Sequence, residues 1–196
     1  SPPDKKLGTM HPATLVAIDL AGADEIYCMG GAHAIAAFAY GTESIEPVDI
    51  IVGPGNQWVT EAKRQVSGIV GIDFLAGPSE VLIIADNSAN SEFIAADLLA
   101  QSEHDPQARG ILLTTDESLG KKVEQELLIH LSQLETADIA QQAWENNGEI
   151  ILVSDINEAI ELANQICPEH LELHIKDPDK IVAKLTNYGS LFIGGY

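Results

Sequence analysis

The sequence predicts an α/β fold, with two incomplete Rossmann-like lobes whose mainly parallel sheets are flanked by helices. Apolar runs of strand length alternate with helical patterns along almost the whole chain, which indicates parallel βαβ units. A Gly-rich stretch at residues 67–78 lacks periodicity, so we place one lobe at residues 1–76 and the second at 77–196. The chain has 196 residues, 45% of them hydrophobic and 20% charged, and is long enough to bury a sizeable core.

The first lobe is expected to contain three helices and two short strands. The helical patterns cover residues 12–23, 32–40 and 57–66. Pro12 suits the first turn of its helix, because a residue there needs no backbone N–H donor. Short apolar segments predict strands at residues 25–29 and 48–52, and each is followed by a turn that contains glycine.

The second lobe repeats the alternation of strands and helices. The predicted strands are residues 81–85, 110–114, 149–153, 171–175 and 190–193, and the predicted helices are residues 91–104, 119–134, 137–146, 156–166 and 179–186.

The charge of the chain excludes several classes of partner. Ten Lys and Arg against thirty Asp and Glu give a net charge of −20, which repels phosphate backbones and anionic membranes. Nucleic acid and membrane are therefore not expected as partners, although local backbone amides can still hold a dinucleotide. The two cysteines, Cys28 and Cys167, form no CxxC pair, and the first residues carry no signal-peptide pattern. We expect a cytoplasmic protein without disulfides.

Two glycine turns are candidate ligand-binding loops. Gly30-Gly31 and Gly53-Pro54-Gly55-Asn56 each lie between a predicted strand and a predicted helix. Neither matches the GxGxxG fingerprint, and the spacing alone favours a tight turn in which Asn56 caps the next helix. Ligand binding is the alternative, because open parallel sheets bind ligands at the carboxyl ends of their strands.

A possible metal site lies near the end of the helix predicted at residues 91–104. Gln101 and His104 are three residues apart and share one helix face, so both could reach a single ion. Imidazole is a common zinc ligand, whereas an amide oxygen is an unusual one. The spacing alone favours the alternative, in which His104 only complements the helix dipole.

Glu169 and His170 form a candidate acid-base pair at the start of a strand. Pro168 is expected to hold Cys167 in an extended conformation and to mark a turn. A carboxylate beside an imidazole suits proton abstraction and activation of water. Without further information an exposed polar turn is the favoured interpretation.

The other histidines have no spaced partner that suggests ligation. We expect His174 on the surface of its strand, His11 at a helix start, and His130 on the solvated face of a long helix.

Taken together, several motifs in order resemble the histidinol dehydrogenase family over essentially the whole chain. The matching stretches are His11–Thr14, Gly30–Ala37, Gly53–Asn56, Thr60–Arg64, Ala76–Val81, Gln101–His104 and Pro168–Leu171. The resemblance implies oxidation of L-histidinol to L-histidine by two hydride transfers to NAD, through an aldehyde that stays bound.

The resemblance also implies a role for each matching residue. Zinc would be held by Gln101 and His104, and would hold the substrate by its amine and imidazole nitrogens. His170 would take the hydroxyl proton, and Glu169 would activate water for attack on the aldehyde. The implied substrate contacts are Ser79, Gln101, His104 and His170, and the implied NAD contacts are Asn56 and the residue at position 33.

Some features depart from the family pattern. His33 stands where the family usually has Gln, and imidazole lacks the paired donor and acceptor of an amide. The family completes its zinc site with an Asp beyond this chain's last residue and a His from the partner subunit of a homodimer. We therefore expect a central fragment that binds zinc weakly and has little or no dehydrogenase activity.

Two other interpretations stay open at this point. A related dehydrogenase could use the same scaffold to oxidise another small polar alcohol. An isolated, non-catalytic domain is the second alternative, although Gln101, His104, Glu169 and His170 argue against a loss of chemistry in the parent protein.

Overall fold

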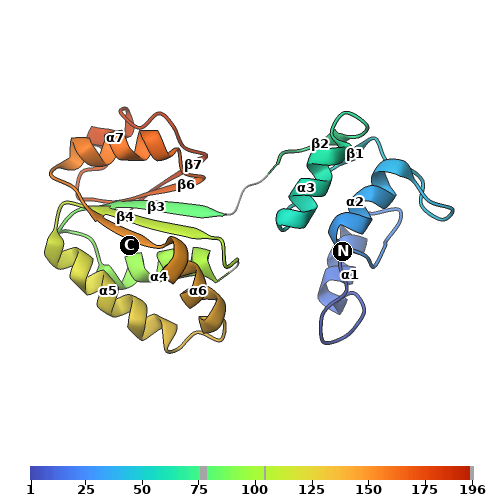
Figure 1. Ribbon diagram of the computed structural model, residues 1–196, viewed down its shortest axis with the longest axis horizontal. Helices are drawn as coiled ribbons and strands as arrows, with labels where there is room; N and C mark the ends of the chain where they lie inside the picture. The colour runs from blue at the N-terminus through green and yellow to red at the C-terminus, as the bar shows by residue number, and fades with distance from the viewer. Residues whose placement is uncertain (76–78, 104, 195–196) are drawn as a thin grey trace. The chain divides into compact units, whose positions relative to one another are not determined.

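The structure, a computed structural model, describes residues 1–75, 79–103 and 105–194. The chain divides into two compact units, Ser1–Gly77 and Pro78–Tyr196 (Figure 1). This division lies one residue from the boundary at 76 and 77 expected from the Gly-rich stretch. Parallel sheets flanked by helices confirm the predicted α/β class.

The first unit is a small helical unit around one short parallel strand pair. Its elements are α1 (Pro12–Leu20), α2 (Gly31–Tyr40), β1 (Ile50–Ile51), α3 (Gln57–Val66) and β2 (Gly71–Ile72). β1 pairs with β2, and the core between them and the helices is made by Ile35, Ala39, Ile51, Val66 and Val70. The amphipathic pattern of residues 57–66 predicted α3 with the bounds that the structure shows.

Two predictions for the first unit are wrong. Residues 25–29 form no strand, because the only described sheet of this unit is the β1–β2 pair and Ile26 is left 38% exposed. Residues 71–72 lie in the stretch expected to lack regular structure, yet they form β2. The pairing with β1 supplies backbone hydrogen bonds that no local sequence pattern shows.

The second unit contains a parallel five-stranded sheet with the strand order β5-β4-β3-β6-β7. Its strands are β3 (Glu80–Ala85), β4 (Arg109–Thr114), β5 (Glu149–Leu152), β6 (His170–His174) and β7 (Ser190–Ile193), and its helices are α4 (Ser91–Ser102), α5 (Glu117–Leu131), α6 (Ala137–Asn147), α7 (Ile156–Ile166) and α8 (Asp179–Val182). Most bounds agree with the predicted ones to within three residues; α8 is the exception, because it ends four residues before the helix predicted at residues 179–186.

Alternation along the strands divides the core of the second unit into two layers. Val81, Ile83 and Ala85 of β3 pack on one face with residues of α4, α5 and α6, whereas Leu82 and Ile84 pack on the other with residues of α7 and α8. Successive strand side chains point to opposite faces, so a central parallel strand must be apolar on both. Figure 1 shows α4, α5 and α6 on one side of the sheet and α7 on the other.

Three helices of the second unit begin at side-chain caps. Asn90, Asp116 and Asp155 precede α4, α5 and α7, and each accepts hydrogen bonds from backbone N–H groups of the first turn. Such caps satisfy donors that have no partner within the helix. Among the described residues, no helix is both long enough and apolar enough to cross a membrane.

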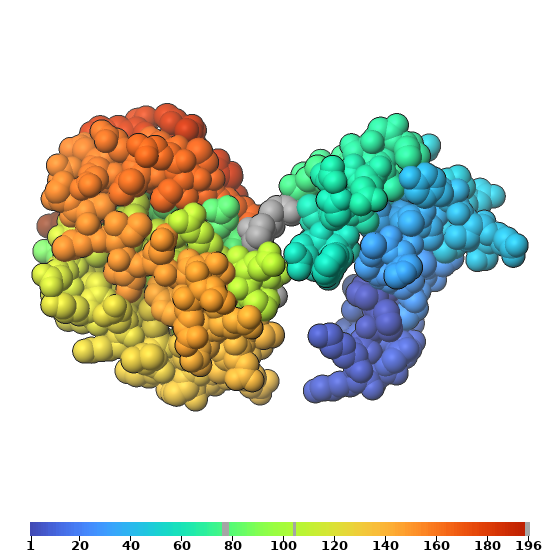
Figure 2. All heavy atoms as spheres, in the orientation of Figure 1, coloured from blue at the N-terminus to red at the C-terminus, as the bar shows by residue number. Residues whose placement is uncertain are grey.

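Truncation of Ile83 tests the two-layer core. Ile83 is fully buried in β3, so Ile83→Ala is expected to lower the free energy of unfolding by about 2–5 kcal/mol through lost contacts and a cavity. Leu128→Ala is the control, because Leu128 of α5 is 70% exposed. Figure 2 shows α5 (yellow) at the surface of the second unit. Urea denaturation followed by circular dichroism measures both. Equal effects of the two substitutions would contradict this description of the core.

Candidate functional site

One face of β6 carries polar side chains where its neighbour β3 is apolar. β6 lies between β3 and β7, and its residues His170, Glu172 and His174 alternate along one face of the sheet. In the parallel register they stand beside Val81, Ile83 and Ala85, the face of β3 that packs with α4. The fold therefore turns these three side chains of β6 toward the α4 side of the sheet.

A hollow of about 240 Å³ lies between α4 and the end of the sheet at β6 and β7. Its lining residues are Val81, Asp97, Ala100, Gln101, His170, Glu172 and Phe192. Asp97 and Gln101 are one helical turn apart, so α4 presents both on the same side. The hollow brings together Gln101 and His170, two of the predicted site residues. His104, the other predicted metal ligand, lies outside the described residues.

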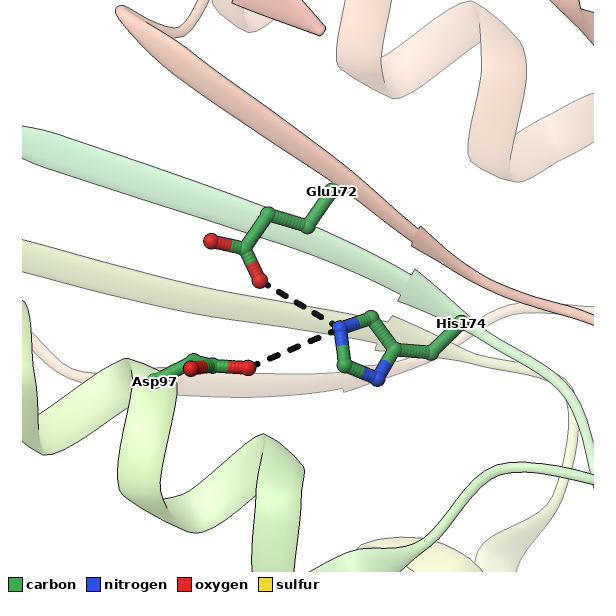
Figure 3. Close-up of side chains that lie close together, drawn as sticks. All are labelled: Asp97, Glu172 and His174. Carbon is green, nitrogen blue, oxygen red and sulfur yellow. Dashed lines mark hydrogen bonds and ion pairs between the residues drawn. The ribbon is translucent and has the colours of Figure 1, made fainter. Parts of the chain in front are cut away.

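Further along β6 on the same face, Asp97, Glu172 and His174 form a cluster of ionisable side chains (Figure 3). His174 Nε2 lies 3.3 Å from Glu172 Oε2 and 3.6 Å from Asp97 Oδ2. The His174 side chain is buried, whereas the two carboxylates are half-buried. Two acidic groups therefore face one imidazole in a setting with limited access to water.

The surroundings of Asp97 disfavour its charged form. Burial, and then repulsion from the nearby Glu172 carboxylate, raise the pKa of Asp97 to about 6. His174 acts in the opposite direction, because a positive imidazole attracts the Asp97 carboxylate. The cluster thus holds more negative charge than its single imidazole offsets near neutral pH.

The same cluster has the composition of a cation site. One ligand atom from each of Asp97, Glu172 and His174 lies within 4.8 Å of the others. Carboxylate oxygens and imidazole nitrogens are the ligands that zinc takes besides thiolates. The Gln101 amide lines the same hollow, so this side of α4 and β6 offers oxygen and nitrogen donors to a metal ion.

The prediction that His174 lies on the surface is wrong. Its side chain is buried because it points toward α4 and not away from the sheet. The signal was present in the sequence: Glu172 and His174 follow His170 at intervals of two, and Asp97 precedes Gln101 by one helical turn. Those spacings place each residue on the same face as a predicted site residue, but they do not show which face is covered.

The Glu169–His170 turn is held by main-chain contacts to the segment before β7. Gly189 N donates to the Pro168 carbonyl at 3.0 Å, and Ser190 N donates to the Glu169 carbonyl at 2.8 Å. Glu169 is exposed on the turn, while His170 is half-buried and its ring lies 5.8 Å from that of Phe192. Of this pair only His170 lines the hollow.

The predicted extended conformation of Cys167 is wrong. Its backbone lies in the left-handed region, with φ of 55°, where it ends α7 by donating its N–H to the Ala163 carbonyl. A left-handed residue commonly terminates a helix, and this termination overrides the preference for an extended residue before proline.

The predicted cofactor and substrate residues outside the hollow occupy turns and helix starts. Asn56 caps α3 and accepts from Trp58 N and Val59 N, as predicted. His33 is exposed in the first turn of α2, and Gly30-Gly31 does not follow a strand. Ser79, directly before β3, accepts from Arg109 N through its carbonyl at 3.1 Å.

Of the two remaining histidines, one lies where it was expected. His11 caps α1, which confirms its place at a helix start. His130 is not on a solvated face: its Nε2 is buried without a hydrogen-bond partner among the described residues. It lines a second hollow of about 300 Å³ with Ala96, Leu99 and Ala100 of α4.

Replacement of Asp97 tests the charge balance of the cluster. Because its pKa is raised to about 6, the folded chain holds this proton more tightly than the unfolded chain does. Ionised Asp97 therefore opposes folding above that pH, and the opposition disappears as the pH falls toward about 4, the ordinary value. Asp97→Asn is expected to raise the urea midpoint relative to the unsubstituted chain at pH 8, and to lose this advantage at pH 4.5.

Glu124→Gln, at an exposed carboxyl of α5, is the matched control and should give no such pH-dependent gain. A gain from Asp97→Asn that is equal at both pH values would contradict the assignment.

Addition of one methyl group tests the contact that holds the Glu169–His170 turn. A Cβ at position 189 would lie 2.6 Å from the Glu169 carbonyl oxygen, so Gly189→Ala must displace this backbone. We expect a loss of about 1–3 kcal/mol in the free energy of unfolding and a shifted turn in a crystal structure. Gly194→Ala is the control, because a Cβ there meets nothing within 4 Å. An unchanged turn would show that the contact does not constrain it.

Comparisons with known proteins agree with this α/β arrangement. The family model for histidinol dehydrogenase matches residues 1–196. Histidinol dehydrogenase of Bacillus cereus is 54% identical over 189 residues, which cover 96% of this chain and 44% of that protein. Histidinol dehydrogenase of Rhizobium meliloti is 54% identical over 187 residues, which cover 95% of this chain and 43% of that protein.

Solved structures give the same result. The structure of histidinol dehydrogenase from Elizabethkingia anophelis has a TM-score of 0.91 and 44% identity, over 100% of this chain and 45% of that chain. Betaine aldehyde dehydrogenase from Staphylococcus aureus, at 13% identity and a TM-score of 0.56, shares the fold alone. The chain spans less than half the length of the histidinol dehydrogenases it matches. By the match of the family model to all 196 residues, the chain belongs to the histidinol dehydrogenase family.

Proposed function

We propose that this chain is the central part of a zinc-dependent histidinol dehydrogenase, which oxidises L-histidinol to L-histidine with NAD in histidine biosynthesis. The observation that carries the proposal is the family match over residues 1–196, combined with the hollow that Gln101 and His170 both line. Gln101 belongs to the proposed metal helix and His170 to the proposed acid-base turn, and the hollow that they share supports the proposal.

His170 and Glu169 are the proposed acid-base pair. The imidazole of His170 takes the hydroxyl proton of the substrate, and its place in the wall of the hollow supports this role. Bound NAD would supply the acceptor for the hydride. Glu169 activates water for attack on the aldehyde, and its exposure on the turn gives it access to solvent. The resulting hydrate would be oxidised in turn, with NAD again supplying the hydride acceptor.

The donor atoms beside the hollow fit a divalent cation. Gln101 and His104 are the proposed zinc ligands, and the carboxylates of Asp97 and Glu172 make the same hollow negative. When bound, zinc would supply a Lewis acid that orients the substrate. Ser79, Gln101, His104 and His170 are the proposed substrate contacts.

Residues 1–76 are the proposed NAD-binding lobe, and residues 77–196 are the lobe with the zinc and acid-base residues. Asn56 supports the first assignment, because its Oδ1 accepts from Trp58 N and Val59 N and leaves its amide N–H groups as donors for a cofactor. His33 is the second proposed NAD contact, and its exposure leaves the ring accessible. A cytoplasmic homodimer is the proposed form of the complete enzyme, to which the partner subunit contributes a zinc ligand.

Calorimetry with zinc and then with L-histidinol tests this function. The measurement uses this chain and the same chain completed to the length of its relatives. We expect only the completed protein to bind both ligands tightly. In that protein, Gln101→Ala should weaken the binding of zinc by about tenfold or more. Gln141→Ala, at an exposed glutamine of α6, is the matched control.

The outcomes separate the remaining alternatives. If the completed protein binds zinc but not L-histidinol, the substrate is another small polar alcohol. If it binds neither ligand, the chain is a non-catalytic domain. Dehydrogenase activity in the 196-residue chain itself would overturn the proposal that this part alone is inactive.

A further inference from the structure

A buried ion pair in the first unit forms hydrogen bonds with the loop that leads into α3. Lys63, on α3, is only 4% exposed although it is charged, and Asp73 follows directly after β2. Lys63 Nζ lies 2.6 Å from Asp73 Oδ1, and the Asp73 side chain is 13% exposed. A buried lysine needs such a partner, because an uncompensated charge away from water is costly.

Both members of the pair also bind the same loop residue, Gly53. Lys63 Nζ donates to the Gly53 carbonyl at 2.5 Å, and Gly53 N donates to Asp73 Oδ2 at 2.9 Å. The backbone donor and acceptor of Gly53 are therefore both used by one ion pair. Contact with Lys63, and then with the Gly53 and Phe74 N–H groups, lowers the pKa of Asp73 well below its usual range.

The conformation of Gly53 explains why the loop needs this support. Gly53 has φ of +139°, a value that residues with a side chain rarely adopt. Glycine also loses more backbone entropy on folding than other residues do, so two hydrogen bonds to its main chain restrict a segment that would otherwise be flexible. Lys63 and Asp73 thus select one shape for the chain that enters residues 54–56.

The far end of the same loop is fixed by α3 itself. Asn56 Oδ1 accepts from Trp58 N at 3.1 Å and from Val59 N at 3.2 Å. Lys63 lies two turns further along the same helix, so α3 holds the loop at both Gly53 and Asn56. The side-chain oxygen of Asn56 is used by the helix cap, so the position of the loop determines where its amide N–H groups point.

We propose that Lys63 and Asp73 are positioning residues for NAD. They fix loop 53–56 so that Asn56 can contact the cofactor, and they do not contact the cofactor themselves. This inference rests on the proposed function, in which Asn56 contacts NAD. An ion pair that served stability alone would not require both partners to form hydrogen bonds with the same loop residue. Apolar residues of similar volume commonly stabilise a fold as well as a buried ion pair does.

The test compares Lys63→Met with Arg64→Met in the chain completed to the length of its relatives. Lys63→Met keeps most of the length of the side chain but removes the ammonium group that makes both polar contacts. Arg64→Met is the matched control, because Arg64 is the next residue of α3 and pairs with Glu61 at the exposed surface. Two readouts apply: calorimetric affinity for NAD and for zinc, and hydrogen exchange of the backbone amides of residues 53 and 55–57 without cofactor.

We expect Lys63→Met to weaken the binding of NAD about tenfold or more, with zinc affinity unchanged. Amide exchange in residues 53 and 55–57 should become faster by a similar factor. Lys63→Arg should restore part of the NAD affinity, because guanidinium can donate to both the carbonyl and the carboxylate. Arg64→Met should change neither readout. If Lys63→Met does not fold, Asp73→Asn takes its place. This substitution removes one of the two carboxylate oxygens that accept from Lys63 Nζ and Gly53 N.

Asn56→Asp distinguishes failure of the positioning role from failure of the proposed function. This variant keeps the helix cap but loses the amide donor. If Asn56→Asp weakens NAD and a folded Lys63 or Asp73 variant does not, the positioning role is wrong while the function stands. Equal weakening of NAD and zinc by Lys63→Met would also overturn it, because that result indicates a general structural role. If Asn56→Asp leaves NAD affinity unchanged, the assignment of the loop to NAD falls instead.

Discussion

The parallel pairing of β3 with β6 is the constraint on which the candidate site depends. The two strands are far apart in sequence, and their pairing places the helix that follows β3 beside the polar face of β6. Asp97 and Gln101 of α4 thereby meet His170 and Glu172 around one hollow. The apolar side chains on both faces of β3 allow this arrangement, because a central parallel strand packs against helices on both faces. A shift of one residue in the β6 register would turn every polar side chain to the opposite layer.

Two aspartates show how position decides the chemistry of one residue type. Asp97 is half-buried beside Glu172 and binds its proton more tightly than usual, whereas Asp73 accepts from Lys63 and from backbone N–H groups and binds its proton less tightly. The first carboxylate is short of positive partners, which suits a place that receives a cation or a cationic substrate. The second is fully paired, which suits a group that holds a loop in place.

The elements that the sequence predicted well are those whose patterns are local. Helix 57–66, helix 156–166 and strand 190–193 have their predicted bounds, because caps and periodicity lie within the segments themselves. The predicted strand at 25–29 failed because an apolar run becomes a strand only when another strand pairs with it. The same reason explains β2, which is formed by two residues that pair with β1 and carry no strong pattern of their own.

By itself the sequence determined the α/β class and the family motifs, since these depend on residue type and short spacing. The candidate roles of Gln101, Glu169 and His170 are what the resemblance to the family implies. Only the tertiary structure decided that His174 is buried between two carboxylates and that Lys63 and Asp73 share Gly53. Burial and ion pairing depend on which distant segments meet. Periodicity shows that a residue shares a face with its neighbours, but packing between elements decides whether that face is covered.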